Sequence, residues 1–344
     1  MKHYCQMLVS FVAFWCVIST TVWAQDIHYT QFYADVLRLN PANTGNFGAD
    51  YRFGANARTQ WNAVPVPYQT LSAYADLAWL RNRRTATSNW IGSGIRLLAD
   101  QAGTGRLSTY EAAASAAGHL NLGNVGYLSL GANLTFVQKQ VDFGRLYFSS
   151  QWNEVDFDPD KSSQENIIGN RLSYIDIGTG MVANVRIADN ILWHLGAAGL
   201  HVNRPKISFL NGSENRLGTR LLFHTSGTIV LNNWSIEPAT YYTTQKKAAE
   251  WVIGSNVGIK IGDSGSLHKP QPIKTYFGLW YRHKDAIAPL VGMEMADYRF
   301  LLSYDVNISS LADATRGRGG LEISLVHVGT FNKLTNSTIY CPRF

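Results

Sequence analysis

Residues 251–262 read WVIGSNVGIKIG, and this stretch decides the fold class of the chain. Along it, mostly apolar side chains alternate with small or polar ones. The first set is Trp251, Ile253, Ser255, Val257, Ile259 and Ile261, and the second is Val252, Gly254, Asn256, Gly258, Lys260 and Gly262. Because successive side chains of a β-strand point to opposite faces, the pattern predicts a strand with one apolar face.

The same alternation recurs along the chain, for example from Tyr51 to Trp61 and from Tyr298 to Ile308. We expect about fourteen such segments, an even number that is typical of bacterial outer-membrane barrels. Their expected starts lie near residues 50, 68, 89, 107, 124, 173, 190, 217, 233, 250, 273, 285, 297 and 319.

The polar faces of these segments differ from those of a soluble sheet. They hold glycine, serine, asparagine and isolated charges, and charged residues make up only 16% of the chain, where about 25% is typical. The alternative, a water-soluble sandwich or propeller, usually carries many Lys and Glu on its wet face. The sequence therefore predicts an all-β, transmembrane outer-membrane β-barrel whose apolar face meets lipid and whose small polar face lines the interior.

The alternation also assigns charged residues to the interior, where each needs an opposite charge or water. These residues are Arg52, Arg58, Asp76, Asp176, Arg186, Lys260, Arg282, Arg299 and Asp305. Tryptophans at or near strand ends fit a girdle at the lipid–water interface. They are Trp61, Trp79, Trp90, Trp193, Trp234 and Trp251.

The connections between the expected strands are short at one end of the barrel and long at the other. The tight ones fall at residues 121–124, 188–190, 232–233 and 296–297, and the long ones at 139–172 and 203–215. Short periplasmic turns and longer outer loops are typical of such barrels. The connections at 81–88 and 262–272 depart from this rule on the periplasmic side.

The two ends of the chain lie outside the barrel pattern. Residues 1–24 carry an apolar stretch followed by small residues before a cleavage point after Ala24, and they predict a signal peptide. Residues 25–49 alternate poorly and are expected to form an N-terminal plug or periplasmic segment. The barrel is expected over residues 50–328, followed by a C-terminal periplasmic tail over 329–344. Only Cys341 follows the signal, so no internal disulfide can form.

No catalytic or metal-binding pattern stands out. His224 and Ser226 share a strand face and could form a hydrolase pair, although polar residues that line a barrel explain them as well. His283, Asp285 and Glu294 lack metal-ligand spacing. The positive charge is dispersed among acidic residues, which argues against a nucleic-acid partner. We therefore expect no cofactor, no metal and no enzymatic activity.

Motifs at both ends of the mature chain resemble the PorP/SprF family of type IX secretion system membrane proteins. The opening matches are residues 25–33 (QDIHYTQFY), 39–42 (LNPA) with Gly45, Tyr51-Arg52, Arg58, Gln60-Trp61 and Pro67-Tyr68 with Thr70. The closing matches are residues 303–305 (SYD), Gly320, 322–325 (EISL) and 341–344 (CPRF). Ile27 departs from the family, because proline is expected there in many relatives.

The resemblance implies an outer-membrane barrel that works with the type IX export and gliding machinery and is not an enzyme. Some members are associated with surface proteins that carry a C-terminal sorting domain, and others with periplasmic or outer-membrane components of the machine. The sequence itself identifies neither the cargo nor the stoichiometry.

The first functional hypothesis is a non-enzymatic membrane adaptor in the cell outer membrane that helps to export or anchor a surface protein. The residues expected to contact partners are Gln31, Phe32, Tyr33, Asn40, Arg52, Arg58, Gln60, Trp61, Cys341, Pro342, Arg343 and Phe344. The alternative is an outer-membrane transporter for a small molecule, including a hydrophobic one. An apolar pocket beneath the N-terminal segment would favour that alternative.

Overall fold

A computed structural model describes residues 27, 29–60, 68–81, 88–158, 160–165, 167, 169–211, 214–261, 273–309, 312 and 316–331. The expected signal peptide, Trp61 and residues 341–344 lie outside this part of the chain.

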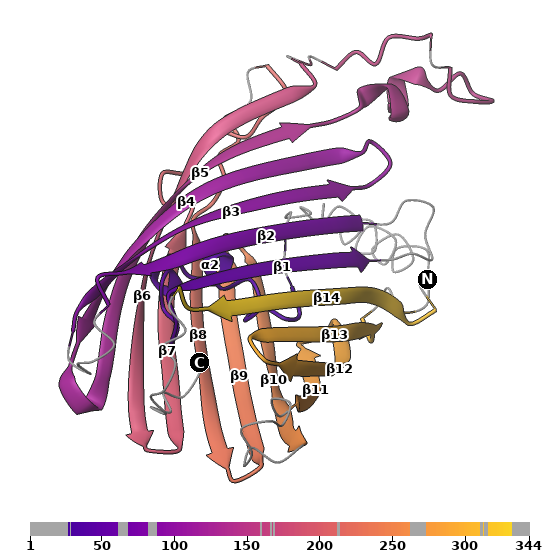
Figure 1. The fold of residues 1–344 in the computed structure, drawn as a ribbon. Helices are drawn as coiled ribbons and strands as arrows, with labels where there is room; N and C mark the ends of the chain where they lie inside the picture. The colour runs from indigo at the N-terminus through magenta and orange to yellow at the C-terminus, as the bar shows by residue number, and fades with distance from the viewer. Residues whose placement is uncertain are drawn as a thin grey trace, which may run out of the picture.

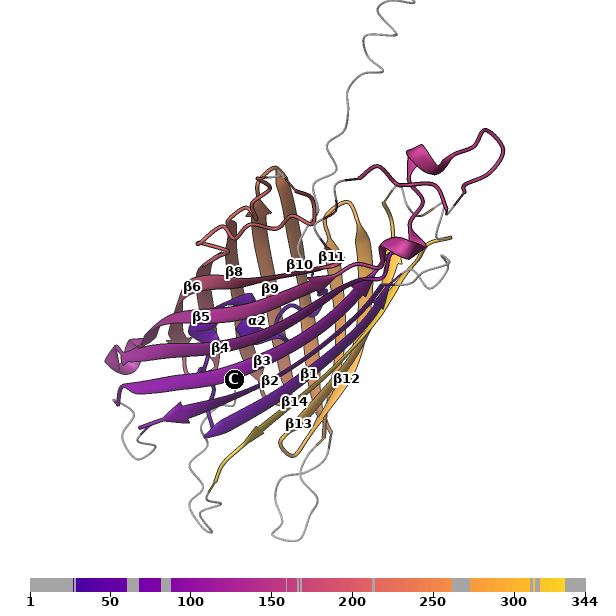
Figure 2. The same ribbon diagram turned by 90° about the horizontal axis from the view of Figure 1, so that it is seen from above.

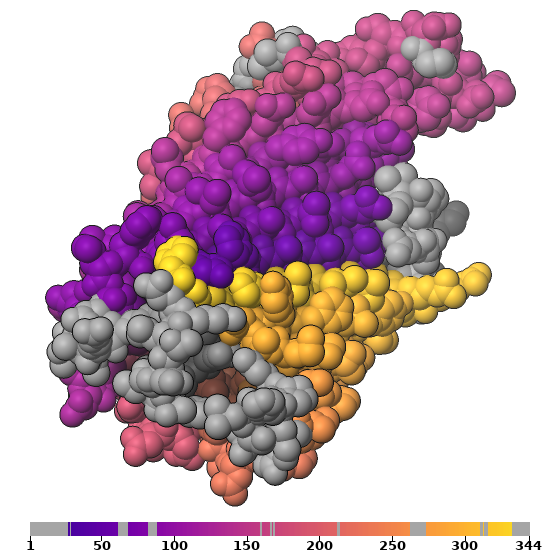
Figure 3. Space-filling model, in the orientation of Figure 1, coloured from indigo at the N-terminus to yellow at the C-terminus, as the bar shows by residue number. Residues whose placement is uncertain are grey.

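Fourteen antiparallel strands form one closed barrel. They are β1 (Tyr51–Gln60), β2 (Tyr68–Trp79), β3 (Trp90–Ala102), β4 (Leu107–Asn121), β5 (Gly126–Gln140), β6 (Arg171–Ala188), β7 (Ile191–Leu200), β8 (Arg220–Leu231), β9 (Trp234–Gln245), β10 (Ala248–Ile261), β11 (Ile273–Arg282), β12 (Ala286–Met295), β13 (Tyr298–Asn307) and β14 (Arg318–Gly329). Each strand pairs with its neighbours in the chain, and β14 closes the ring on β1. Figure 3 shows this seam, with yellow β14 against indigo β1. The expected barrel of about fourteen strands is confirmed.

The closing pair is in continuous register over all ten residues of β1, from Tyr51 opposite Gly329 to Gln60 opposite Gly320. A closed ring leaves no strand edge with unpaired backbone groups, which is what a strand structure needs in hydrocarbon. None of the helices in the described part of the chain is long and apolar enough to cross a membrane.

The two faces of the strands differ as the alternation predicts. Large apolar side chains such as Leu134 (52% exposed) and Phe277 (54% exposed) cover the outside. The inward positions are buried and mostly small or polar. Of the charged residues expected inside, Arg52, Arg58, Asp76, Asp176, Arg282 and Asp305 are buried. Arg186 and Lys260 share the inward phase, but they are exposed because they lie near strand ends.

One of the expected girdle tryptophans points the other way. Trp79, Trp234 and Trp251 are exposed on the outside, whereas Trp90 is only 4% exposed. Its indole stacks on His119 with ring centroids 4.5 Å apart, and its Nε1 donates to the carbonyl of Gly45 at 3.0 Å. The girdle prediction is wrong for Trp90, because its place in the strand alternation directs it inward.

The connections follow the expected asymmetry in part. One end of the barrel has the tight connections 122–125, 189–190, 232–233 and 296–297, and also 80–89 and 262–272, which depart from the rule as expected. The other end has the long connections 141–170 and 201–219, and also tight ones at 103–106, 246–247 and 283–285. The 141–170 connection projects well beyond the strands (Figures 1 and 2). Because long loops are extracellular in bacterial barrels, the end opposite the 141–170 and 201–219 connections is periplasmic, and we call it the tight-turn end.

The helices are short. They are α2 (Val36–Leu39) and η1 (Pro41–Asn43) before the first strand, and η2 (Gly123–Val125), η3 (Phe143–Arg145) and η4 (Ser149–Gln151) in connections. Both views of the ribbon place α2 inside the ring of strands (Figures 1 and 2).

Candidate functional site

Residues 29–50, which we call the N-terminal segment, lie against the inward faces of the strands. Most of its side chains are buried, including polar ones such as Thr30, Gln31 and Asn40. A polar side chain removed from water must find hydrogen-bond partners inside the protein, because an unpaired buried group lowers the stability of the folded state by about 1 to 3 kcal/mol. The partners of this segment come from strands around the barrel.

Glu322 on β14 holds the start of the segment. Its carboxylate accepts hydrogen bonds from the backbone N–H of Thr30 at 2.9 Å and of Gln31 at 2.8 Å. The Gln31 side chain donates from Nε2 to Ser303 Oγ at 2.8 Å and accepts from Ser324 Oγ at 2.6 Å. The backbone and side chain of Gln31 are therefore both fixed to β13 and β14.

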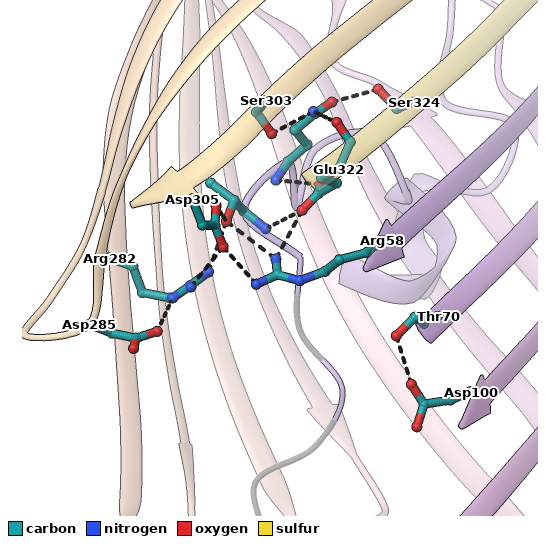
Figure 4. A network of polar contacts seen from close by, with 11 residues as sticks. Arg58, Thr70, Asp100, Arg282, Asp285, Ser303, Asp305, Glu322 and Ser324 are labelled. Atoms are coloured by element: carbon teal, nitrogen blue, oxygen red, sulfur yellow. Dashed lines mark hydrogen bonds and ion pairs between the residues drawn. The ribbon is translucent and has the colours of Figure 1, made fainter. Parts of the chain in front are cut away.

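Two arginines balance the buried carboxylates at this point. Arg58 on β1 pairs with Glu322 at 2.9 Å and with Asp305 on β13 at 2.7 Å. Arg282 on β11 pairs with Asp305 at 2.9 Å and donates to Thr30 Oγ1 at 2.8 Å. Figure 4 shows these side chains converging, and by their positions they come from β1, β11, β13 and β14. Because β1 and β14 form the closing seam, the network joins the first and last strands of the barrel to the N-terminal segment.

Aromatic side chains pack the next two residues. The ring of Phe32 lies 4.6 Å from that of Tyr241 and 5.6 Å from that of Trp280. Tyr33 lies 5.0 Å from Trp280, and its hydroxyl accepts from Asn256 Nδ2 at 3.1 Å.

Asn40 fixes the middle of the segment. Its side-chain oxygen accepts from the backbone N–H of Ala42 and caps η1, while Nδ2 donates to the carbonyls of Met181 at 3.0 Å and Ala197 at 3.1 Å. Nδ2 also lies 3.2 Å from Nε2 of His224. Glycine makes this approach possible, because a Cβ at Gly180 would lie 2.0 Å from the Asn40 oxygen.

The end of the segment is held near the tight-turn end of the barrel. Asp76 accepts from the backbone N–H of Gly45 at 2.8 Å and pairs with Arg52 through two hydrogen bonds, of 3.0 and 2.7 Å. Gly45 has φ +72°, and a Cβ there would lie 2.5 Å from the Cα of Gly92. A side chain at either glycine would push the segment off the wall.

These three anchors set the direction of the segment. Thr30 contacts Arg58, Arg282 and Asp305 near the last residues of β1, β11 and β13, at the same rim as the 141–170 and 201–219 connections. Gly45 contacts Asp76 and Trp90, near the opposite rim. The segment therefore runs lengthwise through the interior, from the outer half to the periplasmic rim.

The structure brings together six of the residues expected to contact partners. Gln31, Phe32, Tyr33 and Asn40 belong to the N-terminal segment, and Arg52 and Arg58 bind it from β1. Gln60, at the end of β1, is half-buried and makes no contact in these anchors.

Sequence reasoning missed Glu322 as the partner of Arg58, and it also missed Glu111 and Glu237. Glu111 lies 2.9 Å from Arg96, and Glu237 pairs with Arg299 at 2.7 Å and with Lys274 at 3.3 Å. The signal for Glu322 was its inward phase between Gly320 and Ser324. Among the described residues, no group of three or more His, Cys, Asp or Glu is arranged to hold a metal ion.

The connection at residues 141–170 carries an exposed turn in its middle. A bridge joins Trp152 to Phe157, and the Asn153 side chain accepts from the backbone N–H of Val155 at 3.0 Å and of Asp156 at 2.7 Å. Val155 is 85% exposed and Tyr147 is 65% exposed. We call residues 147–158 the outer tip.

Comparison with known proteins gives one family and several barrels. The family model described as type IX secretion system membrane protein PorP/SprF matches residues 22–326. No curated protein matches the chain. Among solved structures, a Pseudomonas aeruginosa FadL homologue is 10% identical, with 83% of this chain and 91% of that one covered and a TM-score of 0.47.

Two further solved structures are similar to the chain at the same level. The CymD monoaromatic hydrocarbon channel is 12% identical, with 86% and 93% of the chains covered and a TM-score of 0.46. The P. putida toluene transporter TodX is 10% identical, with 85% and 93% covered and a TM-score of 0.45.

Proposed function

The chain belongs to the PorP/SprF family of type IX secretion system membrane proteins, and from this membership we propose that it is a non-enzymatic adaptor for an exported surface protein. It is a protein of the cell outer membrane, with a closed barrel whose outside is apolar. In the proposed role, the barrel holds a secreted protein with a C-terminal sorting domain at the surface or helps to export it.

The observation that carries this proposal is the anchoring of the N-terminal segment along the length of the interior. Thr30 and Gln31 bind Glu322, Asn40 binds the walls of β6 and β7, and Gly45 binds Asp76. A segment held by so many buried polar contacts acts as a plug that closes the interior to solutes. The surfaces that bind partners are then expected at the outer and periplasmic ends of the barrel.

The outer tip is the surface proposed to contact the exported protein. It presents Tyr147, Trp152, Val155 and Phe157 to solvent, and aromatic side chains are enriched where proteins bind one another. Its own turn bonds hold it in shape before binding, which lowers the entropy cost of association. Glu154 adds negative charge at the tip, and residues 147–158 contain no Lys or Arg.

The opposite end is proposed to face the secretion machine. After removal of a signal peptide at residues 1–24, the periplasmic turns and the tail at 329–344 would be available to periplasmic components. Cys341, Pro342, Arg343 and Phe344 are the proposed contacts in the tail. Gln31, Phe32, Tyr33, Asn40, Arg52 and Arg58 are proposed to act through the anchored segment rather than by direct contact.

A capture experiment tests the outer tip. An affinity tag is inserted at the exposed Thr104 in the turn between β3 and β4, and the barrel is purified from detergent-solubilised outer membrane. We expect the wild-type barrel to retain a surface protein and secretion components. The double variant Trp152→Ser, Val155→Ser should lose the surface protein and keep the secretion components.

The control replaces an apolar residue by serine in another outer loop. Leu210→Ser removes an exposed apolar side chain from the 201–219 connection and should leave capture intact. Equal loss in both variants, or capture of neither class of protein by the wild type, would defeat the adaptor proposal.

Transport of a small molecule remains the competing outcome. It predicts conductance or uptake through the barrel, with secretion unchanged when the gene is deleted.

His224, the candidate catalytic residue of a hydrolase, is buried beside Asn40, and we propose that it supports the segment. Ser226→Ala should therefore leave capture and secretion unchanged.

A further inference from the structure

A groove of about 520 Å³ opens on the outside of the barrel across β6 to β10. Small-molecule pockets in proteins span about 300 to 1,000 Å³, so it has the volume of a binding site. Its floor is made by Ala183, Ala197, Thr225 and Thr240, and its aromatic wall by Phe223, Tyr242 and Trp251. We call this feature the outer groove.

Strand register explains the shape of the outer groove. Trp251 lies opposite Tyr242, Tyr242 opposite Phe223, and Phe223 opposite Ala197, which forms one row across four strands. The adjoining row places Thr240 opposite Thr225. In that adjoining row the two threonines stand between Leu195 and Ile253. The hollow lies where these shorter threonine side chains, together with Ala183 and Ala197, stand beside the rings of Phe223, Tyr242 and Trp251.

The groove faces lipid rather than the interior. The lining residues Tyr242 and Phe223 are exposed on the outward phase, whereas Tyr241 and His224 on the opposite phase are buried, and His224 also lines the groove. In a closed outer-membrane barrel, the outward phase meets hydrocarbon.

The floor of the groove has its polar groups already satisfied. Thr240 Oγ1 accepts from Trp251 Nε1 at 2.9 Å and donates to a backbone carbonyl at 2.7 Å. Thr225 Oγ1 accepts from Trp193 Nε1 at 2.7 Å and likewise donates to a carbonyl at 2.9 Å. The floor thus offers methyl groups and ring faces, which suit an apolar occupant without directional bonds.

We propose that the outer groove binds one acyl chain of an outer-membrane lipid. An acyl chain is the apolar, flexible molecule that surrounds this face, and a hollow lined by small residues lets it make close dispersion contacts on three sides. The site lies directly behind the middle of the N-terminal segment, because the carbonyls of Met181 and Ala197 accept from Asn40. This inference does not depend on the proposed secretion role.

The test measures lipid retained by the intact barrel. The full-length mature protein is placed in nanodiscs of palmitoyl-oleoyl phosphatidylethanolamine and phosphatidylglycerol, then released into the gas phase and weighed. We expect one retained lipid, of either head group, on the wild-type protein. Ala197→Phe fills the floor with an apolar ring and should lose this adduct, and Ala183→Phe should do the same.

The matched control is Ala73→Phe on β2, which makes the same change at an exposed outward position away from the groove. It should retain the lipid as the wild type does, and heat modifiability on a gel verifies that all variants fold. Equal retention by Ala197→Phe and the wild type would overturn the proposal. Retention of only one head-group class would also overturn it, since recognition would then lie outside the groove, as would a co-purified membrane protein displaced by Ala197→Phe.

Discussion

Replacing Glu322 by glutamine removes one buried charge and keeps the size of the side chain. In the wild-type protein the carboxylate receives three donors, from Thr30 N at 2.9 Å, Gln31 N at 2.8 Å and Arg58 at 2.9 Å. Glutamine has one acceptor oxygen and an NH₂ group, so at least one of these donors would face another donor.

The expected cost follows from this geometry. Removing one partner of a buried ion pair costs about 3 to 5 kcal/mol. Arg58 keeps Asp305 at 2.7 Å, so the lower end of that range, about 3 kcal/mol, applies. The strands keep their own backbone ladder, and the loss should therefore appear first as release of the N-terminal segment. At about 1.4 kcal/mol per tenfold change, the released population should rise by about 100-fold.

Hydrogen exchange at α2 measures that release. The amide of Leu39 donates to Asp35 at 3.1 Å and that of Asn40 to Val36 at 3.2 Å, so neither bond involves Glu322. Their exchange in lipid nanodiscs should quicken by about 100-fold in Glu322→Gln if the whole segment detaches.

A matched control changes an exposed glutamate. Glu214→Gln alters a residue that pairs with Lys206 at 2.8 Å on an outer loop, and it should leave exchange at α2 unchanged. Exchange in Glu322→Gln within twofold of the wild type would refute the view that the network holds the segment.

Further changes test other contacts. Gly180→Ala should cost about 1 to 3 kcal/mol of overpacking, measured by urea unfolding, because its Cβ would meet Asn40; Gly118→Ala is the control, with nothing within 4 Å. Leu134→Arg should destabilise the folded barrel in vesicles by about 2 to 4 kcal/mol, as expected for a cation near the middle of the lipid face, whereas Leu134→Ala should cost less. Phe32→Ala should lower the unfolding free energy by about 3 to 5 kcal/mol, and a loss under 1 kcal/mol would show that its ring contacts with β9 and β11 do not hold the segment.

The barrel could be predicted because lipid acts on each strand separately. The alternation in residues 251–262 predicts a strand that the structure places at Ala248–Ile261, and the last strand, expected near 319, begins at Arg318. Local alternation suffices, since a charged side chain on the lipid face would be costly at almost every position.

The partners inside the barrel could not be predicted in the same way. Arg58 was assigned to the interior, but its partners Asp305 and Glu322 lie 247 and 264 residues away in the chain. Trp90 lies at a strand end, as an interface residue would, but the strand alternation directs it inward, and only the structure shows that its indole there donates to the carbonyl of Gly45.

The sequence by itself determined which side chains of each strand enter hydrocarbon, because that choice is made residue by residue. Only the tertiary structure decided that the N-terminal segment lies lengthwise inside the ring closed by β1 and β14, and that two alanines and two threonines leave a groove on its outer surface. Both depend on which strands stand side by side and in which register.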